Sequence, residues 1–198
     1  MADTGVDKKR RRFLIGATSA VGAVGVGAIA IPFIGSLTPS ARALAAGAPV
    51  EVDISKIEPG QLVRTIWRGK PVWIVNRTDE MLASLPTVDP KLKDPNSDVV
   101  TQQPEYAKNP TRARKEKYAV IVGICTHLGC SPTYRPEVAP ADLGSDWVGG
   151  FYCPCHGSRF DLAGRVVKGS PAGTNLVIPP YYYKTDTLIL VGEDGGVA

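Results

Sequence analysis

The chain has 198 residues, of which 43% are hydrophobic. This ordinary composition excludes a collagen-like or wholly disordered protein, and the length fits one domain with extensions. The formal net charge is +4, but the excess lies in residues 8–12 and the remaining sequence is nearly neutral. Because no basic face with interleaved aromatic residues is present, we expect no binding to nucleic acid.

An uncharged stretch follows the basic residues and covers residues 13–41. About 20 apolar residues in a helix cross a bilayer core, whereas the apolar part of a cleaved signal peptide has only about 7–15. The stretch therefore predicts a retained transmembrane anchor over residues 13–37, with the basic residues 1–12 in the cytoplasm. The alternative is a removed signal, because Ala41-Arg42-Ala43 resembles a cleavage site.

The start of the chain also carries an export pattern. The segment Arg10-Arg11-Arg12-Phe13-Leu14 resembles a twin-arginine signal, although Lys9 stands where serine or threonine is usual. A basic run before any bacterial anchor is the simpler explanation. After the anchor, residues 38–49 are rich in alanine and lack large apolar side chains, so we expect a hinge or tether that is either flexible or helical.

Residues 50–198 show the short alternating segments of a β protein. A hairpin is predicted where Leu62–Trp67 and Val72–Val75 flank a turn at residues 68–71. Thr78 can cap a short helix that runs through Leu85. The further predicted strands are Val50–Ile54, Tyr118–Ile124, Leu176–Ile178, Tyr181–Lys184 and Thr187–Val191.

Between the helix and the later strands lies a polar, proline-rich excursion, Pro86–Lys117, in which we expect short helical turns and whose role the sequence does not reveal. Many short strands separated by Gly and Pro turns indicate a mainly β fold. We predict an antiparallel sandwich or barrel, preceded by one N-terminal transmembrane helix.

All four cysteines and both histidines of the chain lie in two short loops. The loops are Cys125-Thr-His127-Leu-Gly-Cys130 and Cys153-Pro-Cys155-His156-Gly-Ser158. Each loop offers one Cys–His half-site, and two Cys with two His would already satisfy a structural zinc ion. Cys130 and Cys155 remain, and we predict that they form a disulfide joining the loops, which an exported domain permits.

These loops resemble the Rieske family, because both of its motifs, C-x-H-x-G-C and C-x-C-H-x-S, are matched in full. The resemblance implies a Rieske-type fold with a small cluster-binding subdomain at about residues 124–170. It also implies one [2Fe–2S] cluster, with one iron held by two thiolates and the other by two imidazoles. The implied iron ligands are Cys125, Cys153, His127 and His156. Zinc would leave the second cysteine pair unexplained.

The resemblance also assigns the residues around the cluster. Ser158 would donate its hydroxyl to a bridging sulfide, whereas its simpler role is to finish a tight turn. Gly129 and Gly157 would let backbone N–H groups approach the sulfurs, and Leu128 would form an apolar lid beside the imidazoles. Residues 169–173 (GSPAG) stand in place of the family's proline loop.

One position departs from the family pattern. Many quinol-oxidising relatives have a tyrosine where this chain has Phe160, so the hydroxyl that would donate to a ligand sulfur is missing. We therefore expect a lower reduction potential than in those relatives.

The extra cysteine pair and the anchor are similar to those of the iron–sulfur subunits of bacterial ubiquinol–cytochrome c oxidoreductases (cytochrome bc-type complexes). That likeness implies that His156 contacts ubiquinol and accepts a proton, and that the electron passes to a cytochrome c-type haem. The implied partners are cytochrome b and cytochrome c-type subunits in a dimeric complex, with the Rieske domain on the periplasmic face of the inner membrane. The alternatives are the Rieske subunit of an exported molybdenum oxidase, such as arsenite oxidase, and a ring-hydroxylating oxygenase component.

Overall fold

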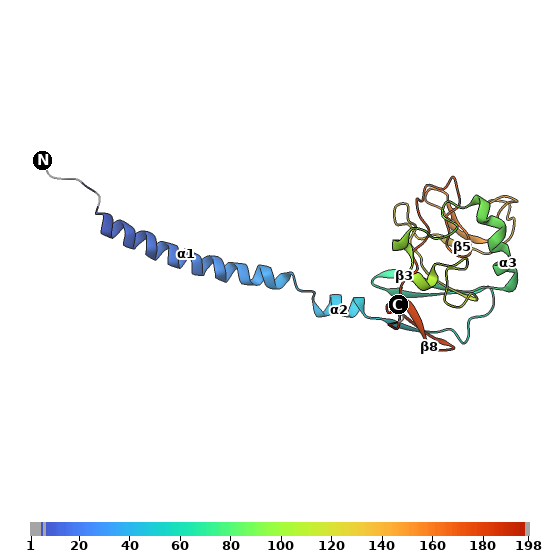
Figure 1. The fold of residues 1–198 in the computed structure, drawn as a ribbon, viewed down its shortest axis with the longest axis horizontal. Helices are drawn as coiled ribbons and strands as arrows, with labels where there is room; N and C mark the ends of the chain where they lie inside the picture. Colours follow the sequence, from blue (N-terminus) through green and yellow to red (C-terminus); the bar gives the residue numbers. More distant parts are fainter. Residues whose placement is uncertain (1–4, 6, 197–198) are drawn as a thin grey trace. The chain divides into compact units, whose positions relative to one another are not determined.

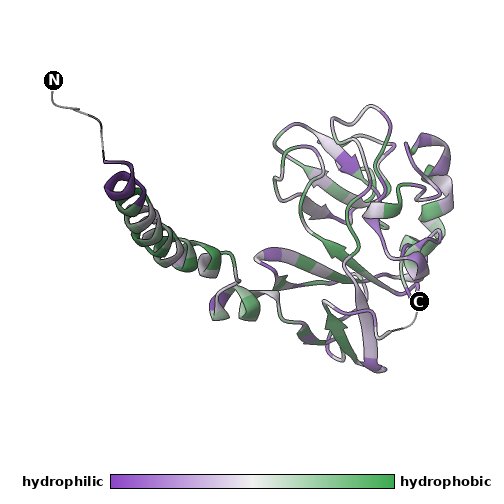
Figure 2. Cartoon of the chain, turned by 60° about the vertical axis from the view of Figure 1, so that its left-hand side comes forward, coloured by the Kyte–Doolittle hydropathy of each residue, from purple (hydrophilic) through white to green (hydrophobic). Residues whose placement is uncertain are grey.

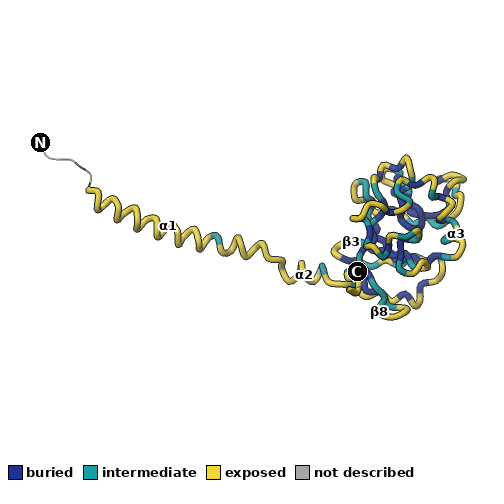
Figure 3. Tube along the Cα trace, in the orientation of Figure 1, coloured by how far each residue is buried: buried dark blue, intermediate teal, exposed yellow. Residues whose placement is uncertain are grey.

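The N-terminal part of the chain is one long apolar helix, α1 (Lys8–Ser36). The computed structural model describes residue 5 and residues 7–196, and the chain divides into two units after Ala45. Asp7 caps α1, because its side chain accepts hydrogen bonds from the backbone N–H groups of Lys9 and Arg10. No residue of α1 is buried (Figure 3). Its length and apolar composition allow it to cross a membrane (Figure 2).

The predicted tether contains a short helix, α2 (Ala41–Gly47). The Ser40 hydroxyl accepts a hydrogen bond from the backbone N–H of Ala43 at this helix's start. Of the two conformations left open by the alanine-rich sequence, the structure has the helical one, in keeping with the helix propensity of alanine.

Residues 46–198, here called the head, contain three antiparallel sheets of three strands each in the part of the chain described (Figure 1). The first sheet has the order β1 (Val50–Asp53), β9 (Leu188–Val191), β8 (Tyr181–Thr185). The second has the order β2 (Leu62–Trp67), β3 (Lys70–Asn76), β4 (Tyr118–Val122). The third has the order β5 (Thr133–Arg135), β6 (Gly150–Cys153), β7 (Ser158–Phe160). The predicted mainly β, antiparallel fold with one N-terminal apolar helix is confirmed.

The predicted hairpin joins β2 to β3, but its turn is tighter than expected. Trp67 pairs with Lys70, so only Arg68 and Gly69 form the turn. Both have positive φ, 51° and 70°, as a two-residue hairpin turn of the mirror-image type requires.

The predicted strand at Leu176–Ile178 does not form. The N–H of Leu176 donates to Gly164, that of Ile178 donates to Gln102, and the carbonyl of Val177 accepts from Val122. Because these backbone groups bond to three separate segments, no ladder with a single partner strand develops.

The helix predicted from Thr78 is α3 (Asp79–Val88), and it runs three residues past its predicted end at Leu85. Thr78 caps it by accepting a hydrogen bond from Met81. Pro86 lacks an N–H group and disfavours helical backbone at the residue before it, so the sequence predicts that the helix ends at Leu85. The backbone of Asp89 instead donates to the Pro86 carbonyl and completes the last turn.

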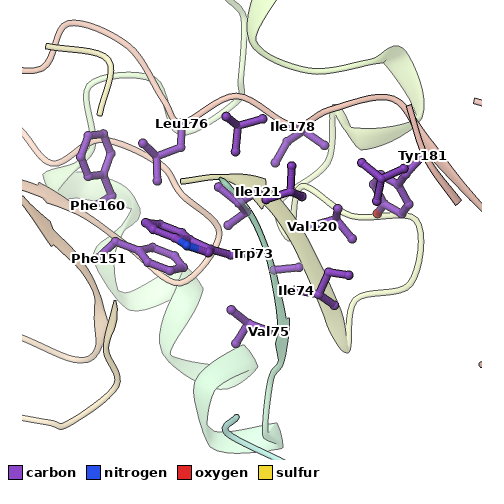
Figure 4. Close-up of a cluster of buried hydrophobic side chains, with 14 of the residues drawn as sticks. Trp73, Ile74, Val75, Val120, Ile121, Phe151, Phe160, Leu176, Ile178 and Tyr181 are labelled. Atoms are coloured by element: carbon purple, nitrogen blue, oxygen red, sulfur yellow. The ribbon is translucent and has the colours of Figure 1, made fainter. Parts of the chain in front are cut away.

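The core joins the second and third sheets (Figure 4). Trp73 of β3 stacks on Phe151 of β6 with ring centroids 5.1 Å apart and 12° between the planes. A Cβ atom at Gly123 would lie 2.2 Å from the Trp73 ring, so only glycine fits where the chain leaves β4. The sheet that leads into the first cysteine–histidine loop is thereby packed against the sheet that holds the second.

The polar excursion contains the predicted short helical turns, three 3-10 helices. These are η1 (Asp89–Lys91), η2 (Val100–Gln102) and η3 (Glu105–Ala107). The excursion is anchored by buried residues, including Leu92 and Arg112, which are 1% and 0% exposed.

Candidate metal centre

The first loop begins just after β4 and closes on itself through two backbone hydrogen bonds. The N–H of Gly129 donates to the Cys125 carbonyl at 3.0 Å, and the N–H of Cys125 donates to the Cys130 carbonyl at 2.7 Å. Gly129 has a φ of +84°, a conformation that glycine adopts without steric cost.

The second loop is the connection between β6 and β7, in which Cys153 pairs with Ser158. The N–H of Gly157 donates to the Cys153 carbonyl at 2.9 Å, and Gly157 has a φ of +76°. In both loops, therefore, the N–H of a glycine with positive φ donates to the carbonyl of the cysteine four residues earlier. Two matching turns present two matching Cys–His half-sites.

The half-sites meet with their thiols buried, whereas His127 is half-buried and His156 lies at the surface. Cys125 and Cys153 are 3% and 2% exposed, and their side chains are within hydrogen-bonding reach of each other. Burial is the main reason why the pKa of the Cys153 thiol is raised. The rings of His127 and His156 lie 4.8 Å apart and are perpendicular, and His156 is exposed.

The remaining cysteines form the predicted disulfide, Cys130–Cys155, which links the two loops across 25 residues of sequence. Both disulfide sulfurs lie within 4.8 Å of the Cys153 sulfur. Because disulfide sulfurs carry no thiolate charge, the donors that remain for a metal are two thiols and two imidazoles, grouped by type. This grouping fits a binuclear iron cluster with unlike ligands on its two irons.

Ser158 is fully buried beside these donors. Its Oγ accepts a hydrogen bond from the backbone N–H of Ala172 at 3.0 Å, so its own hydroxyl hydrogen is available to a further acceptor. Phe160 is also fully buried, whereas Leu128, between the two halves of the first motif, is 72% exposed. An apolar side chain this exposed at the loop tip fits contact with another apolar surface.

Sequence reasoning missed the residues that tie the proline loop (residues 169–173) to this site. The hydroxyl of Thr126 donates to the carbonyl of Thr174, the residue that follows the loop, at 2.6 Å. The Ser170 hydroxyl accepts from the N–H of Arg159 at 3.0 Å, and Lys93 reaches the same loop from the excursion. Thr126 stands at an unspecified position of the first motif and Ser170 lies outside both motifs. Lys93 is separated from the loop by 77 residues or more, so no local pattern indicates these contacts.

Fold and site together define a class of protein. Residues 96–181 match the family model of the Rieske [2Fe-2S] domain, and residues 1–40 match the model described as "Ubiquitinol-cytochrome C reductase Fe-S subunit TAT signal". The head is a Rieske domain, whose cofactor is one [2Fe–2S] cluster, and the twin-arginine resemblance is confirmed.

Whole-chain comparisons give the family. The chain is 67% identical to the ubiquinol-cytochrome c reductase iron-sulfur subunit of Allochromatium vinosum, over 100% of this chain and 95% of that protein. It is 45% identical to the subunit of the same name from Blastochloris viridis, over 96% and 94% of the two chains. A solved structure titled "Hyperthermophilic respiratory Complex III" aligns with a TM-score of 0.49 at 29% identity, covering 89% of this chain and 98% of that one. The chain belongs to the ubiquinol–cytochrome c reductase iron–sulfur subunits.

This membership makes the chain an electron-transfer subunit of an oxidoreductase complex. Membership of this family excludes the two alternatives that the motifs left open, a molybdenum-oxidase subunit and a ring-hydroxylating oxygenase component.

Proposed function

We propose that Cys125 and Cys153 hold one iron of the cluster and that His127 and His156 hold the other. The observation that carries this proposal is the sorting of the donors, with two buried thiols on one side and a pair of imidazole rings on the other. The bound cluster supplies a centre that takes up and releases one electron.

The second part of the proposal concerns ubiquinol. His156 is exposed, and an imidazole with one nitrogen on iron keeps its other nitrogen free to accept a hydrogen bond from a quinol hydroxyl. Negative charge that arrives beside an imidazole favours its protonated form, so electron and proton are taken up together. Leu128, exposed beside His127, gives the contact an apolar border.

Around the ligands, Ser158 would donate its hydroxyl to a bridging sulfide. Gly129 and Gly157 would leave room for backbone N–H groups to point at the sulfurs. Each of these donors stabilises the reduced, more negative cluster and raises its potential.

In the membrane, residues 1–12 would be cytoplasmic, residues 13–37 would form the anchor, and residues 38–49 would be the hinge or tether. The Rieske domain, residues 50–198, would lie in the periplasm of a bacterium. The basic residues at the start of α1 and its exposed apolar surface support this orientation. The partners would be cytochrome b and a cytochrome c-type subunit within a dimeric complex, and the α2 segment would let the head carry its electron between them.

The test is electron paramagnetic resonance of reduced membranes that contain the full complex, with and without an inhibitor of the quinol site. We expect a Rieske signal that shifts when the inhibitor binds. A Rieske signal that ignores the inhibitor would contradict quinol contact at His156, and the absence of any such signal would contradict the ligand set.

A further inference from the structure

The start of the polar excursion lies along the segment that leads into the proline loop. Leu92 and Val167 form an antiparallel bridge. The N–H of Lys93 donates to the Val166 carbonyl at 3.0 Å, and the N–H of Lys168 donates to the Lys91 carbonyl at 2.7 Å. Because Leu92 is 1% exposed, this pairing is anchored in the head and fixes the backbone of Lys93 beside the loop.

From this position the Lys93 side chain reaches two carbonyl groups of the proline loop. Its Nζ donates to the Ser170 carbonyl at 2.7 Å and to the Ala172 carbonyl at 2.8 Å. Hydrogen bonds from an ammonium group are roughly twice as strong as neutral ones. Along the backbone, one of these carbonyls precedes the Ala172 N–H and the other follows it. The Ala172 N–H is the group that donates to the Ser158 Oγ.

The other end of the loop is held by the same short segment. The Asn175 side chain donates to the Asp94 carbonyl at 3.0 Å and accepts from the N–H of Val166 at 2.9 Å. Residues 169–174 form no strand or helix, so these side chains take the place of a backbone ladder in fixing the loop. Lys93 supplies the charged contact of this set.

We infer that Lys93 is a positioning residue that holds the proline loop on Ser158 and thereby raises the reduction potential of the cluster. With the Ala172 N–H fixed on one lone pair of the Ser158 Oγ, the hydroxyl hydrogen is directed away from the loop. The inference rests on the proposed ligand set and on Ser158 facing the cluster.

The experiment is a redox titration of the Rieske signal in the full complex carrying Lys93→Met. We expect a lower midpoint potential than in the wild type, and a value close to the wild type in Lys93→Arg, which keeps a charged donor. The matched control is Lys168→Met: it removes a lysine next to the loop whose Nζ donates at 2.9 Å to the Pro90 carbonyl rather than to the loop. Its potential should not change.

A second measurement separates positioning from a general loss of stability. Ser158→Ala should lower the potential in the wild type and lower it by a smaller amount in Lys93→Met, because the two residues act through one contact. If Lys93→Met does not retain the cluster, the same comparison is made in Lys93→Gln, which keeps a neutral donor.

A potential unchanged in the Lys93 variant, or lowered equally in Lys168→Met, would overturn the inference. The inference would also be overturned if Ser158→Ala lowered the reduction potential by the same amount in the wild type and in Lys93→Met. Failure of the proposed function is a different result, because the wild type itself would then lack a Rieske signal or an inhibitor response.

Discussion

At the scale of single residues, Phe160 is the position at which the Rieske resemblance led us to expect a tyrosine. The side chain is fully buried and pairs across the ladder with Phe151. A buried aromatic ring without a hydroxyl fills space but offers no hydrogen bond to a ligand sulfur.

Phe160→Tyr should therefore raise the reduction potential, because an added donor stabilises the reduced cluster. A redox titration of the variant measures the change. Phe151→Tyr is the matched control, since it adds a hydroxyl to the paired ring, and it should leave the potential in place. An unchanged or lowered potential in Phe160→Tyr would contradict this role.

Residue-scale predictions from sequence were good where chemistry restricts the residue type. The disulfide partners were identified because only two cysteines remained after each loop had supplied its Cys–His half-site. Lys93 could not be identified, because its carbonyl partners are backbone atoms brought close only by the fold. A lysine in a polar segment is otherwise a solvated surface residue.

At the scale of elements, the disulfide joins two loops that belong to separate parts of the core. Cys130 follows β4, and Cys155 lies between β6 and β7. The bond holds together half-sites that no strand pairing connects directly.

The double variant Cys130→Ser/Cys155→Ser should lose the cluster faster than the wild type on heating. In the chain-entropy description, a disulfide that spans 25 residues stabilises the folded protein by about 3–4 kcal/mol, and the double variant loses this stabilisation. Visible absorbance during heating measures cluster loss. Cluster retention equal to that of the wild type would show that the disulfide does not stabilise the site.

The excursion is attached to the head by a buried arginine as well as by Lys93. Arg77 donates to the carbonyls of Thr111 at 2.9 Å and Leu162 at 3.3 Å, and to that of Glu116. Burial lowers the pKa of Arg77 to about 10, opposed by the charge of Asp161, so the guanidinium stays protonated at neutral pH.

Arg77→Met should destabilise the head by about 3 kcal/mol or more, because buried carbonyls lose their donor. Denaturant unfolding of the chain checks this value. Arg64→Met, at an exposed position of β2, is the control and should change stability by less than about 0.5 kcal/mol. Similar effects of the two substitutions would count against the anchoring role of Arg77.

Element predictions from sequence succeeded where the signal is local. The β2–β3 hairpin and the Thr78 cap were predictable because turn residues and caps act within a few positions. The strand expected at Leu176–Ile178 failed because its apolar residues enter the core, at 0% and 2% exposed for the two end residues, while its backbone serves three partners. Apolar character predicts burial more securely than it predicts pairing.

At the scale of the whole molecule, the chain combines an export signal, an apolar helix and a head that carries its own core. The twin-arginine pathway suits a domain whose cofactor is inserted before export. The pair at the signal's twin position is Arg10-Arg11, because Phe13 and Leu14 follow after one residue.

Arg10→Lys/Arg11→Lys should block export while leaving the basic charge unchanged. Protease added to spheroplasts measures the exposed head, which should become protected in the variant. Arg12→Lys is the matched control, because it lies one position beyond the pair and should leave the head accessible. Normal export of the double variant would contradict the role of the arginine pair and would indicate an export pathway that requires only positive charge.

The place where the tether enters the head has a mechanical consequence. The tether leads into β1, whose partner β9 ends at Val191, close to the C-terminus, and neither strand belongs to the sheet that carries the second cysteine–histidine loop. A force transmitted along the tether falls first on the β1–β9 hydrogen bonds. A pull on the tether would therefore load the β1–β9 pairing before it loads the separate sheet that carries the second cysteine–histidine loop.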